Sequence, residues 1–235
     1  MATKPPKVLP HGEPEPVCPE LWSVTGSLPF PLRRNMVVYR LASGNLLLHS
    51  VIAMTDDGMA RLDALGKPTI IVVPNGGHRM DVAFYKGRYP GARVVCPAAA
   101  RAKVEEVVAV DAAAEEALPA LGVRPHALTG FKNGELAYEL DVAGGKALVM
   151  GDAVANRDYA PGLFGSFLAN VTGGVKGRLG VARIVKMTLI NSKAAARQDL
   201  ARLAEIAALK AVVPAHGRPV VERCGEALRE AAASI

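Results

Sequence analysis

Three short apolar runs constrain the fold of this chain more than any other feature. They are TIIVVP (69–74), KALVMGD (146–152) and KAVVPAH (210–216). A strand with one solvated face alternates apolar and polar residues, whereas a continuous apolar, β-branched run is typical of a strand buried on both faces. Half of the 235 residues are hydrophobic, so the chain can supply a core of that size. We therefore expect a layered sheet structure.

Shorter segments complete the predicted sheets. Strands are indicated at 21–26, 35–43, 45–51, 92–97 and 135–142, and Ser43-Gly44-Asn45 predicts a tight hairpin turn. The strand–helix–strand order from 69 to 97 predicts a parallel crossover, because parallel neighbours cannot be joined by a tight turn.

Helices are expected to cover these sheets from outside. They are predicted from Asp56 onward, over most of 98–121, over 199–209 and at the C-terminal end. No linker divides the chain. We predict one domain over 21–235, preceded by an irregular, proline-rich arm over 1–20.

The net charge of +6 belongs to one segment. Between 159 and 198 there are six cations and no acidic residue, whereas basic and acidic residues balance elsewhere. This glycine-rich, apolar stretch could line a cleft for an anionic substrate, touch a membrane surface, face a partner or form an ordinary solvated helix face. Nucleic acid is disfavoured as a partner, since aromatic residues are only 5% of the chain and no recognition motif accompanies the cations.

Cysteine usage and hydropathy indicate a cytoplasmic protein. The three cysteines are far apart and form no CxxC pair, which suits a reducing compartment. No apolar run of membrane-spanning length occurs, and prolines and charges fill the first 20 residues where a signal peptide would need an apolar stretch.

Polar side chains that could carry chemistry follow the three apolar runs. His78 comes after 69–74, Asp152 ends 146–152 and His216 ends 210–216. Strand ends converge on a crevice in layered folds. Two imidazoles and a carboxylate form an N/N/O ligand set for Zn²⁺, or alternatively for Fe²⁺ or Mn²⁺. The sequence therefore predicts a divalent metal site.

The residues around His78 receive separate predictions. Asp81 directly precedes a helical stretch, so a helix N-cap is the preferred interpretation over a metal ligand. Arg79 could bind an anionic substrate or pair with Asp152. Asn75 could present its amide to a substrate, although a turn role before Gly76-Gly77 is preferred.

Four segments in order resemble the metallo-β-lactamase superfamily. They are 69–97 (strand, metal loop, helix and strand), GFKNGELAYEL (130–140), ALVMGDA (147–153) and VVPAHG (212–217). The resemblance covers nearly the whole chain from about residue 20. It implies an α+β fold, a four-layer αββα sandwich of two mixed β-sheets with helices on the outer faces.

The metal motif of that superfamily is altered in this chain. Its H-x-H-x-D-H pattern falls on Asn75, Gly77, Arg79 and Met80, and its GHTPGS histidine falls on Phe131. Only Asp152 and His216 match the family's ligands. His78 and Asp81 lie in the same loop but one position away from the motif. The resemblance therefore implies a degenerate branch without the family's two-metal centre, and a single ion at His78, Asp152 and His216 stays a prediction from their position after the apolar runs.

Two functions follow as hypotheses. The first is a metal-dependent hydrolase of an ester, a lactone or a phosphoester, in which Asp152, His216 and His78 form the catalytic metal site and Arg79 orients negative charge. The second is a module without catalysis and without a metal, whose basic apolar segment 163–190 docks a partner, a second subunit or an anionic membrane surface.

Overall fold

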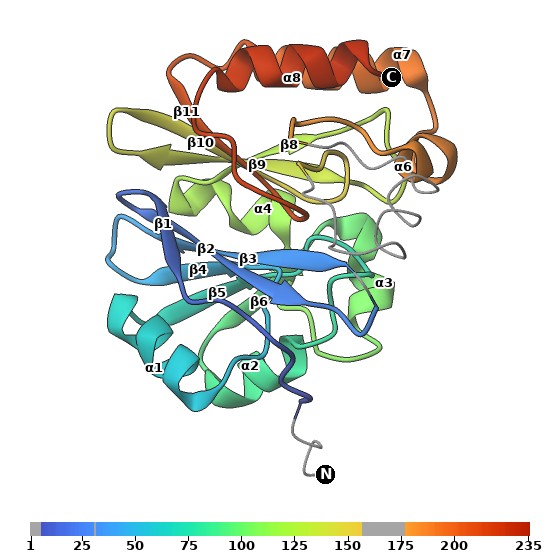
Figure 1. Cartoon of the computed structure of the whole chain (residues 1–235). Coiled ribbons are helices and arrows are strands. Elements are labelled where there is room, and N and C mark those ends of the chain that lie inside the picture. The colour runs from blue at the N-terminus through green and yellow to red at the C-terminus, as the bar shows by residue number, and fades with distance from the viewer. Residues whose placement is uncertain (1–5, 31, 157–176) are drawn as a thin grey trace.

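Two β-sheets pack face to face with helices outside them, as Figure 1 shows in a computed structural model that describes residues 6–30, 32–156 and 177–235. The larger sheet has the order β1-β2-β3-β4-β5-β6-β7 and the smaller one β11-β10-β9-β8. Both sheets are mixed. The predicted α+β, four-layer αββα architecture of two mixed sheets is confirmed.

The larger sheet is antiparallel on one side and parallel on the other. Pairings from β1 to β4 are antiparallel, and those from β4 to β7 are parallel. The strands are β1 (Glu15–Cys18), β2 (Leu21–Ser27), β3 (Arg33–Arg40), β4 (Leu46–His49), β5 (Pro68–Val72), β6 (Arg93–Cys96) and β7 (Ala112–Ala113).

The smaller sheet pairs β10 with β11 in parallel and joins β8, β9 and β10 antiparallel. Its strands are β8 (Arg124–Ala127), β9 (Leu136–Val142), β10 (Gly145–Met150) and β11 (Leu209–Pro214). The faces of the two sheets that meet form one core of mainly β-branched and leucine side chains, including Val37, Ile70, Leu140 and Val213.

Helices cover the outer faces through their own apolar sides. The helices α1 (Asp56–Leu65), α2 (Val82–Arg88) and α3 (Arg101–Val104) pack on the larger sheet. The helices α6 (Arg183–Thr188), α7 (Lys193–Ala204) and α8 (Cys224–Ala233) pack on the smaller one. The short α4 (Ala114–Ala117) contributes Ala114 to the core between the sheets.

Several elements differ from the sequence-based expectations. Part of the predicted irregular arm forms β1, which pairs with β2. The stretch 98–121 is not mostly helical: short helical turns alternate with β7, because the β-branched Val107-Val108 and Val110 and later Pro119 do not favour one long helix. The helix expected over 199–209 begins earlier, at Lys193, where the Ser192 hydroxyl accepts a bond from the N–H of Ala195.

The edge strand β8 was not predicted, because Arg124-Pro125-His126-Ala127 carries almost no apolar signal. Of the basic segment 163–190, residues 163–176 lie outside the described residues. Among the residues that are described, no helix combines the length and apolar character needed to cross a membrane.

The topology brings the carboxyl ends of two parallel strand pairs to one rim. In the larger sheet β4 and β5 are parallel neighbours, and in the smaller sheet β10 and β11 are. The segments that leave these four strands carry Ser50, His78, Asp152 and His216. The rim between the sheets is therefore where the predicted site residues can meet.

Candidate metal centre

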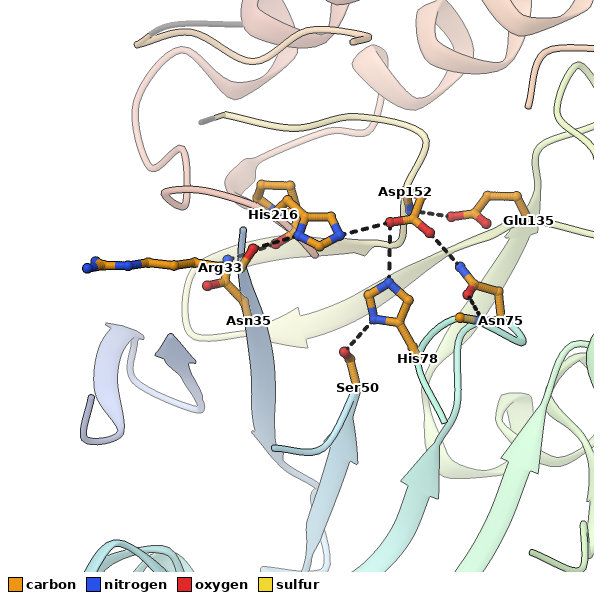
Figure 2. A network of polar contacts seen from close by, with 10 residues as sticks. Arg33, Asn35, Ser50, Asn75, His78, Glu135, Asp152 and His216 are labelled. Carbon is orange, nitrogen blue, oxygen red and sulfur yellow. Dashed lines mark hydrogen bonds and ion pairs between the residues drawn. The ribbon is translucent and has the colours of Figure 1, made fainter. Parts of the chain in front are cut away.

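His78, Asp152 and His216 do converge at this rim, although 139 positions of sequence span them (Figure 2). The Nε2 atoms of His78 and His216 lie 3.2 Å and 3.1 Å from the same carboxylate oxygen, Oδ1 of Asp152. Both imidazoles are buried, while a quarter of the Asp152 side chain is exposed. The three groups thus form a mostly buried cluster with one side open to solvent.

His216 is fixed by the first residues of β3, in the opposite sheet. Its Nδ1 lies 2.7 Å from the carbonyl oxygen of Arg33. Behind it, the Asn35 amide donates to the carbonyls of Pro214 and Gly217, and the Asn35 backbone N–H donates to Ala215. Asn35 is fully buried, so the turn that carries His216 is clamped onto β3.

This contact determines the tautomer of His216. A carbonyl oxygen can only accept, so Nδ1 of His216 carries the proton and donates. In the neutral ring, Nε2 then presents a lone pair to the negative Oδ1 of Asp152 at 3.1 Å. Two acceptors facing each other repel, and the contact needs a positive charge between them, either a proton or a metal ion.

His78 is held by a hydroxyl group on the side of the ring that faces away from Asp152. Its Nδ1 lies 2.7 Å from Oγ of Ser50, which is buried just after β4. Ser50 has φ 58°, a left-handed conformation that costs a non-glycine residue about 1–3 kcal/mol and is found where the surroundings enforce it. A hydroxyl can donate or accept, so Ser50 can support His78 with the proton on either nitrogen.

Asp152 is oriented by two further groups. Its Oδ2 accepts a 2.9 Å bond from the Asn75 amide, whose own oxygen accepts from Gly77 N–H. Its backbone N–H donates to Oε1 of Glu135 at 2.8 Å. Gly151 makes this approach possible, since a Cβ there would sit 2.1 Å from the same Oε1.

The pKa values of the two neighbouring carboxyl groups, Asp152 and Glu135, shift in opposite directions. Burial acts to raise the pKa of Asp152, but the hydrogen bonds with His216 and His78 outweigh it and hold that pKa well below its usual range. For Glu135, burial and then the negative charge of Asp152 raise the pKa to about 8. Asp152 is therefore the carboxylate that carries negative charge at neutral pH.

The donor set and its spacing fit a divalent ion. Two imidazole nitrogens and a carboxylate oxygen are ligands that Zn²⁺ accepts, at about 2.0–2.1 Å each. A tetrahedral angle between two such bonds places the ligand atoms roughly 3.3 Å apart. The 3.1 Å and 3.2 Å separations between the carboxylate oxygen and the two nitrogens are close to that value, and all three ligand atoms lie within 4.8 Å of one another. The lone pair that His216 turns toward Asp152 is the arrangement a metal ligand requires.

Two predictions about the His78 loop need correction. Arg79 does not pair with Asp152: its guanidinium binds Glu106 and the carbonyl of Lys103, which turns it away from the cluster. Asp81 occupies the cap position of α2 but makes no side-chain cap bond. It instead forms a buried ion pair with Arg34 and accepts the backbone N–H of Ala53, which anchors the loop.

Sequence reasoning missed three supporting residues. Asn35 and Ser50 lie in segments interpreted only as strands, and Glu135 in one interpreted as a turn and strand. Asn75 does take the predicted turn role, and it also contacts Asp152. A polar residue inside or beside an apolar strand was the available signal in each case, because burying it requires a partner.

A cleft of about 530 Å³ opens beside Asp152. Its walls come from the His78 loop, the start of α3, the turn before β9, the end of β10 and the residue that follows α6. Asn75, Gly77 and Phe131, where the family's histidines were expected, all line it. Its size is that of an ordinary small-molecule site.

Comparison with known proteins assigns the fold. No protein-family model and no curated protein sequence matches the chain. Among solved structures, DIM-1 metallo-β-lactamase exposed to ceftazidime has a TM-score of 0.63 at 14% identity, covering 96% of this chain and 98% of that one. FIM-1 from Pseudomonas aeruginosa, in its mono-zinc form, has a TM-score of 0.62 at 13% identity, covering 98% and 99%.

A metallo-β-lactamase from Erythrobacter litoralis, with β-mercaptoethanol in its active site, is similar to the same degree. Its TM-score is 0.63 at 14% identity, and the match covers 92% of this chain and 93% of that one. The chain therefore adopts the metallo-β-lactamase fold over nearly its whole length, as the sequence resemblance implied.

Proposed function

We propose that the protein is a metal-dependent hydrolase with a single-ion site, acting on an ester, a lactone or a phosphoester. His78, Asp152 and His216 would hold the ion. The observation that carries the proposal is the convergence of the three ligand atoms: Nδ1 of His216 donates to Arg33, so its Nε2 faces the Asp152 carboxylate, where a proton or a metal ion must lie. Three protein ligands also leave a coordination position open, as catalytic sites require.

A divalent ion at this place supplies a Lewis acid that polarises a carbonyl or phosphoryl oxygen and lowers the pKa of a nearby water. The side chains around it keep the ligand set rigid. Asn75 holds the Asp152 carboxylate in one orientation through Oδ2, and Ser50 holds the ring of His78 through Nδ1. Groups of this kind typically change metal affinity or activity by about 10–100-fold.

The substrate would enter through the cleft beside Asp152. Gly76 and Gly77 line that cleft, where Gly76 packs closely against Lys103 and Gly77 against the Asn75 side chain. A small molecule fits a cleft of this volume. The three cysteines are free, which suits the cytoplasmic location that we propose.

Metal analysis combined with hydrolysis assays tests this function. The untagged protein would be offered Zn²⁺, Fe²⁺ and Mn²⁺ in turn, dialysed and analysed, then assayed on neutral and charged esters, lactones and phosphodiesters. We expect about one equivalent of one metal and turnover that Asp152→Asn abolishes. Less than about 0.1 equivalent of every metal would contradict the proposal.

A second candidate is docking of the basic segment to an anionic membrane surface. On α6, Ile184 and Met187 are 42% and 73% exposed. Burial, and then the nearby cations Lys193, Arg178 and Arg183, lower the pKa of Lys186. Exposed apolar groups beside cations are typical of interfacial helices.

Sedimentation with vesicles that contain phosphatidylserine tests this candidate. Binding that weakens when Arg183 and Lys186 are changed to Gln would support it. Self-association in light scattering, without vesicle binding, would instead favour a second copy of the chain as the partner.

A further inference from the structure

We propose that Lys132 binds an oxyanion of the substrate, a carboxylate or a phosphate, in the cleft beside Asp152. This inference rests on the proposed hydrolase function and deepens it, because it names the substrate class as small anionic esters. It starts from the distribution of charge around the cleft and from the way each cation is already used.

Among the described residues, three cations line the cleft: Arg79, Lys103 and Lys132. Arg79 and Lys103 share one carboxylate, since both donate to Glu106. The hydrogen bonds with Arg79 and then Lys103 lower the pKa of Glu106, so its negative charge persists and offsets theirs. These two cations are therefore partly neutralised.

Lys132 is used differently. Its Nζ donates to the carbonyl of Thr188 at 2.9 Å, and among the described residues it has no acidic partner. An ammonium has three N–H donors, so the side chain keeps donors available for a ligand. Lys132 thus brings one uncompensated positive charge to the cleft.

The backbone of Lys132 is held in place by the segment after α6. Its N–H donates to the carbonyl of Leu189 at 2.8 Å, and the neighbouring Phe131 forms a bridge with Ile190. Asn191 also donates to the carbonyl of Gly130. A cation on a backbone that is already fixed loses less conformational entropy when it binds a ligand.

The remaining walls indicate what carries the oxyanion. Phe131, Leu189, Ala99, Ala100 and Ala153 give the cleft an apolar part beside its charged groups. Asp152 and Glu135 lie at the side of the metal centre, where the two imidazoles and a divalent ion would offset negative charge. A ligand with an apolar body and one oxyanion therefore matches the cleft better than a cationic ligand.

Matched esters test the inference. The neutral 4-nitrophenyl hexanoate and the anionic mono-4-nitrophenyl adipate differ at the end of the acyl chain, by a methyl and a carboxylate group. For the metal-loaded protein we expect Lys132→Ala to lower the ratio of kcat/KM for adipate over hexanoate about tenfold. Lys67→Ala, an exposed lysine at the other end of β5, should leave the ratio unchanged.

A variant of opposite sign sharpens the test. Glu106→Gln frees Arg79 and Lys103, so the same ratio should rise about threefold, and added salt should reduce both effects. Isothermal titration with free adipate and with inorganic phosphate gives a readout without turnover. Lys132→Ala should weaken binding of the preferred anion about tenfold. The anion that binds more tightly identifies carboxylate or phosphate as the group that is recognised.

The outcomes separate the two proposals. If neither ester is hydrolysed but adipate or phosphate binds and Lys132→Ala weakens it, the hydrolase function fails and the anion site stands. If esters are hydrolysed with a ratio that Lys132→Ala leaves unchanged, and neither anion depends on Lys132 for binding, the inference is overturned while the hydrolase stands.

Discussion

Within the described residues, two clusters bring histidine to a carboxylate, and they differ in one proton. At the rim, Nδ1 of His216 donates to a carbonyl, which leaves a lone pair facing Asp152. On the smaller sheet, Nδ1 of His126 faces Nη1 of Arg202, which can only donate. Nε2 of His126 therefore carries the proton that it donates to Glu139 at 2.7 Å.

The comparison shows that residue types alone do not define a metal site. The His126 cluster is complete without an ion, since every contact pairs a donor with an acceptor and the cations Arg124 and Lys146 also lie near Glu139. The rim cluster is complete only when a further proton or a metal ion joins it. The difference comes from the partner of Nδ1, the nitrogen that points away from the carboxylate: a carbonyl that accepts for His216, and a guanidinium that donates for His126.

The largest expected effect concerns how the two clusters are anchored. The loop that carries His78 is held by the buried Arg34–Asp81 pair, whereas Lys146–Asp141 beside the other cluster is exposed. Asp81→Asn leaves a buried guanidinium without its counter-charge and should lower the free energy of unfolding by about 3–5 kcal/mol. Asp141→Asn should cost at most about 1 kcal/mol.

Urea denaturation of the two variants measures this difference. Equal losses would show that the buried pair does not anchor the loop.

The second largest effect concerns Zn²⁺ affinity, which should depend on the rim cluster and not on the His126 cluster. Asp152→Asn removes the anionic ligand, so Zn²⁺ binding measured by calorimetry should weaken about a hundredfold. Glu139→Gln is the matched change in the other cluster and should leave Zn²⁺ affinity as it is in the unchanged protein. Comparable weakening by both variants would mean that the comparison fails.

A fourth histidine allows a prediction about pH. His49 is buried between the sheets, and among the described residues neither of its ring nitrogens has a hydrogen-bond partner. Burial, and then the nearby His78, lower the pKa of His49 to about 3. Between pH 6.5 and 3 the unfolded chain therefore binds more protons than the folded one, and stability falls as pH falls.

Without metal, stability should drop by about 2 kcal/mol from pH 7 to pH 5 through this residue. His49→Phe should remove that part of the dependence, and His126→Gln should not, as urea titrations in EDTA at the two pH values would show. A pH dependence that is the same in all three proteins would exclude His49 as its source.

The smallest expected effect isolates the hydroxyl that supports His78. Ser50→Gly places glycine in a left-handed backbone conformation that glycine adopts without strain, so stability should not decrease. Loss of the hydrogen bond to Nδ1 of His78 should nevertheless weaken Zn²⁺ binding about tenfold. Ser50→Ala should weaken Zn²⁺ binding equally and should also lower the stability of the fold. If the glycine variant binds Zn²⁺ normally, Ser50 has no part in holding the ligand.

Much of the fold was predictable, because long apolar strands carry a strong local signal. The runs that became β5, β10 and β11 were predicted as strands, and the order of elements implied the layers. β8 was missed because an edge strand need not be apolar, and the start of α7 because its first turn is polar and depends on a cap at Ser192.

The three metal candidates were predictable from their position after apolar strands, but their environment was not. Which nitrogen of His216 is protonated depends on the carbonyl of Arg33, 183 positions away, and no local pattern encodes that contact. The predicted pairing of Arg79 with Asp152 was wrong for the same reason, because Arg79 contacts Glu106 only in the folded chain, where the end of α3 packs beside the His78 loop.

Anomalous diffraction at the zinc edge, from crystals of the protein soaked in Zn²⁺, would show whether the rim cluster holds a metal ion. We expect one strong peak within coordination distance of Nε2 of His78, Nε2 of His216 and Oδ1 of Asp152, and none at His126 and Glu139. A rim cluster without a peak, at a zinc concentration that fills the surface sites, would mean that these three residues do not form a metal site.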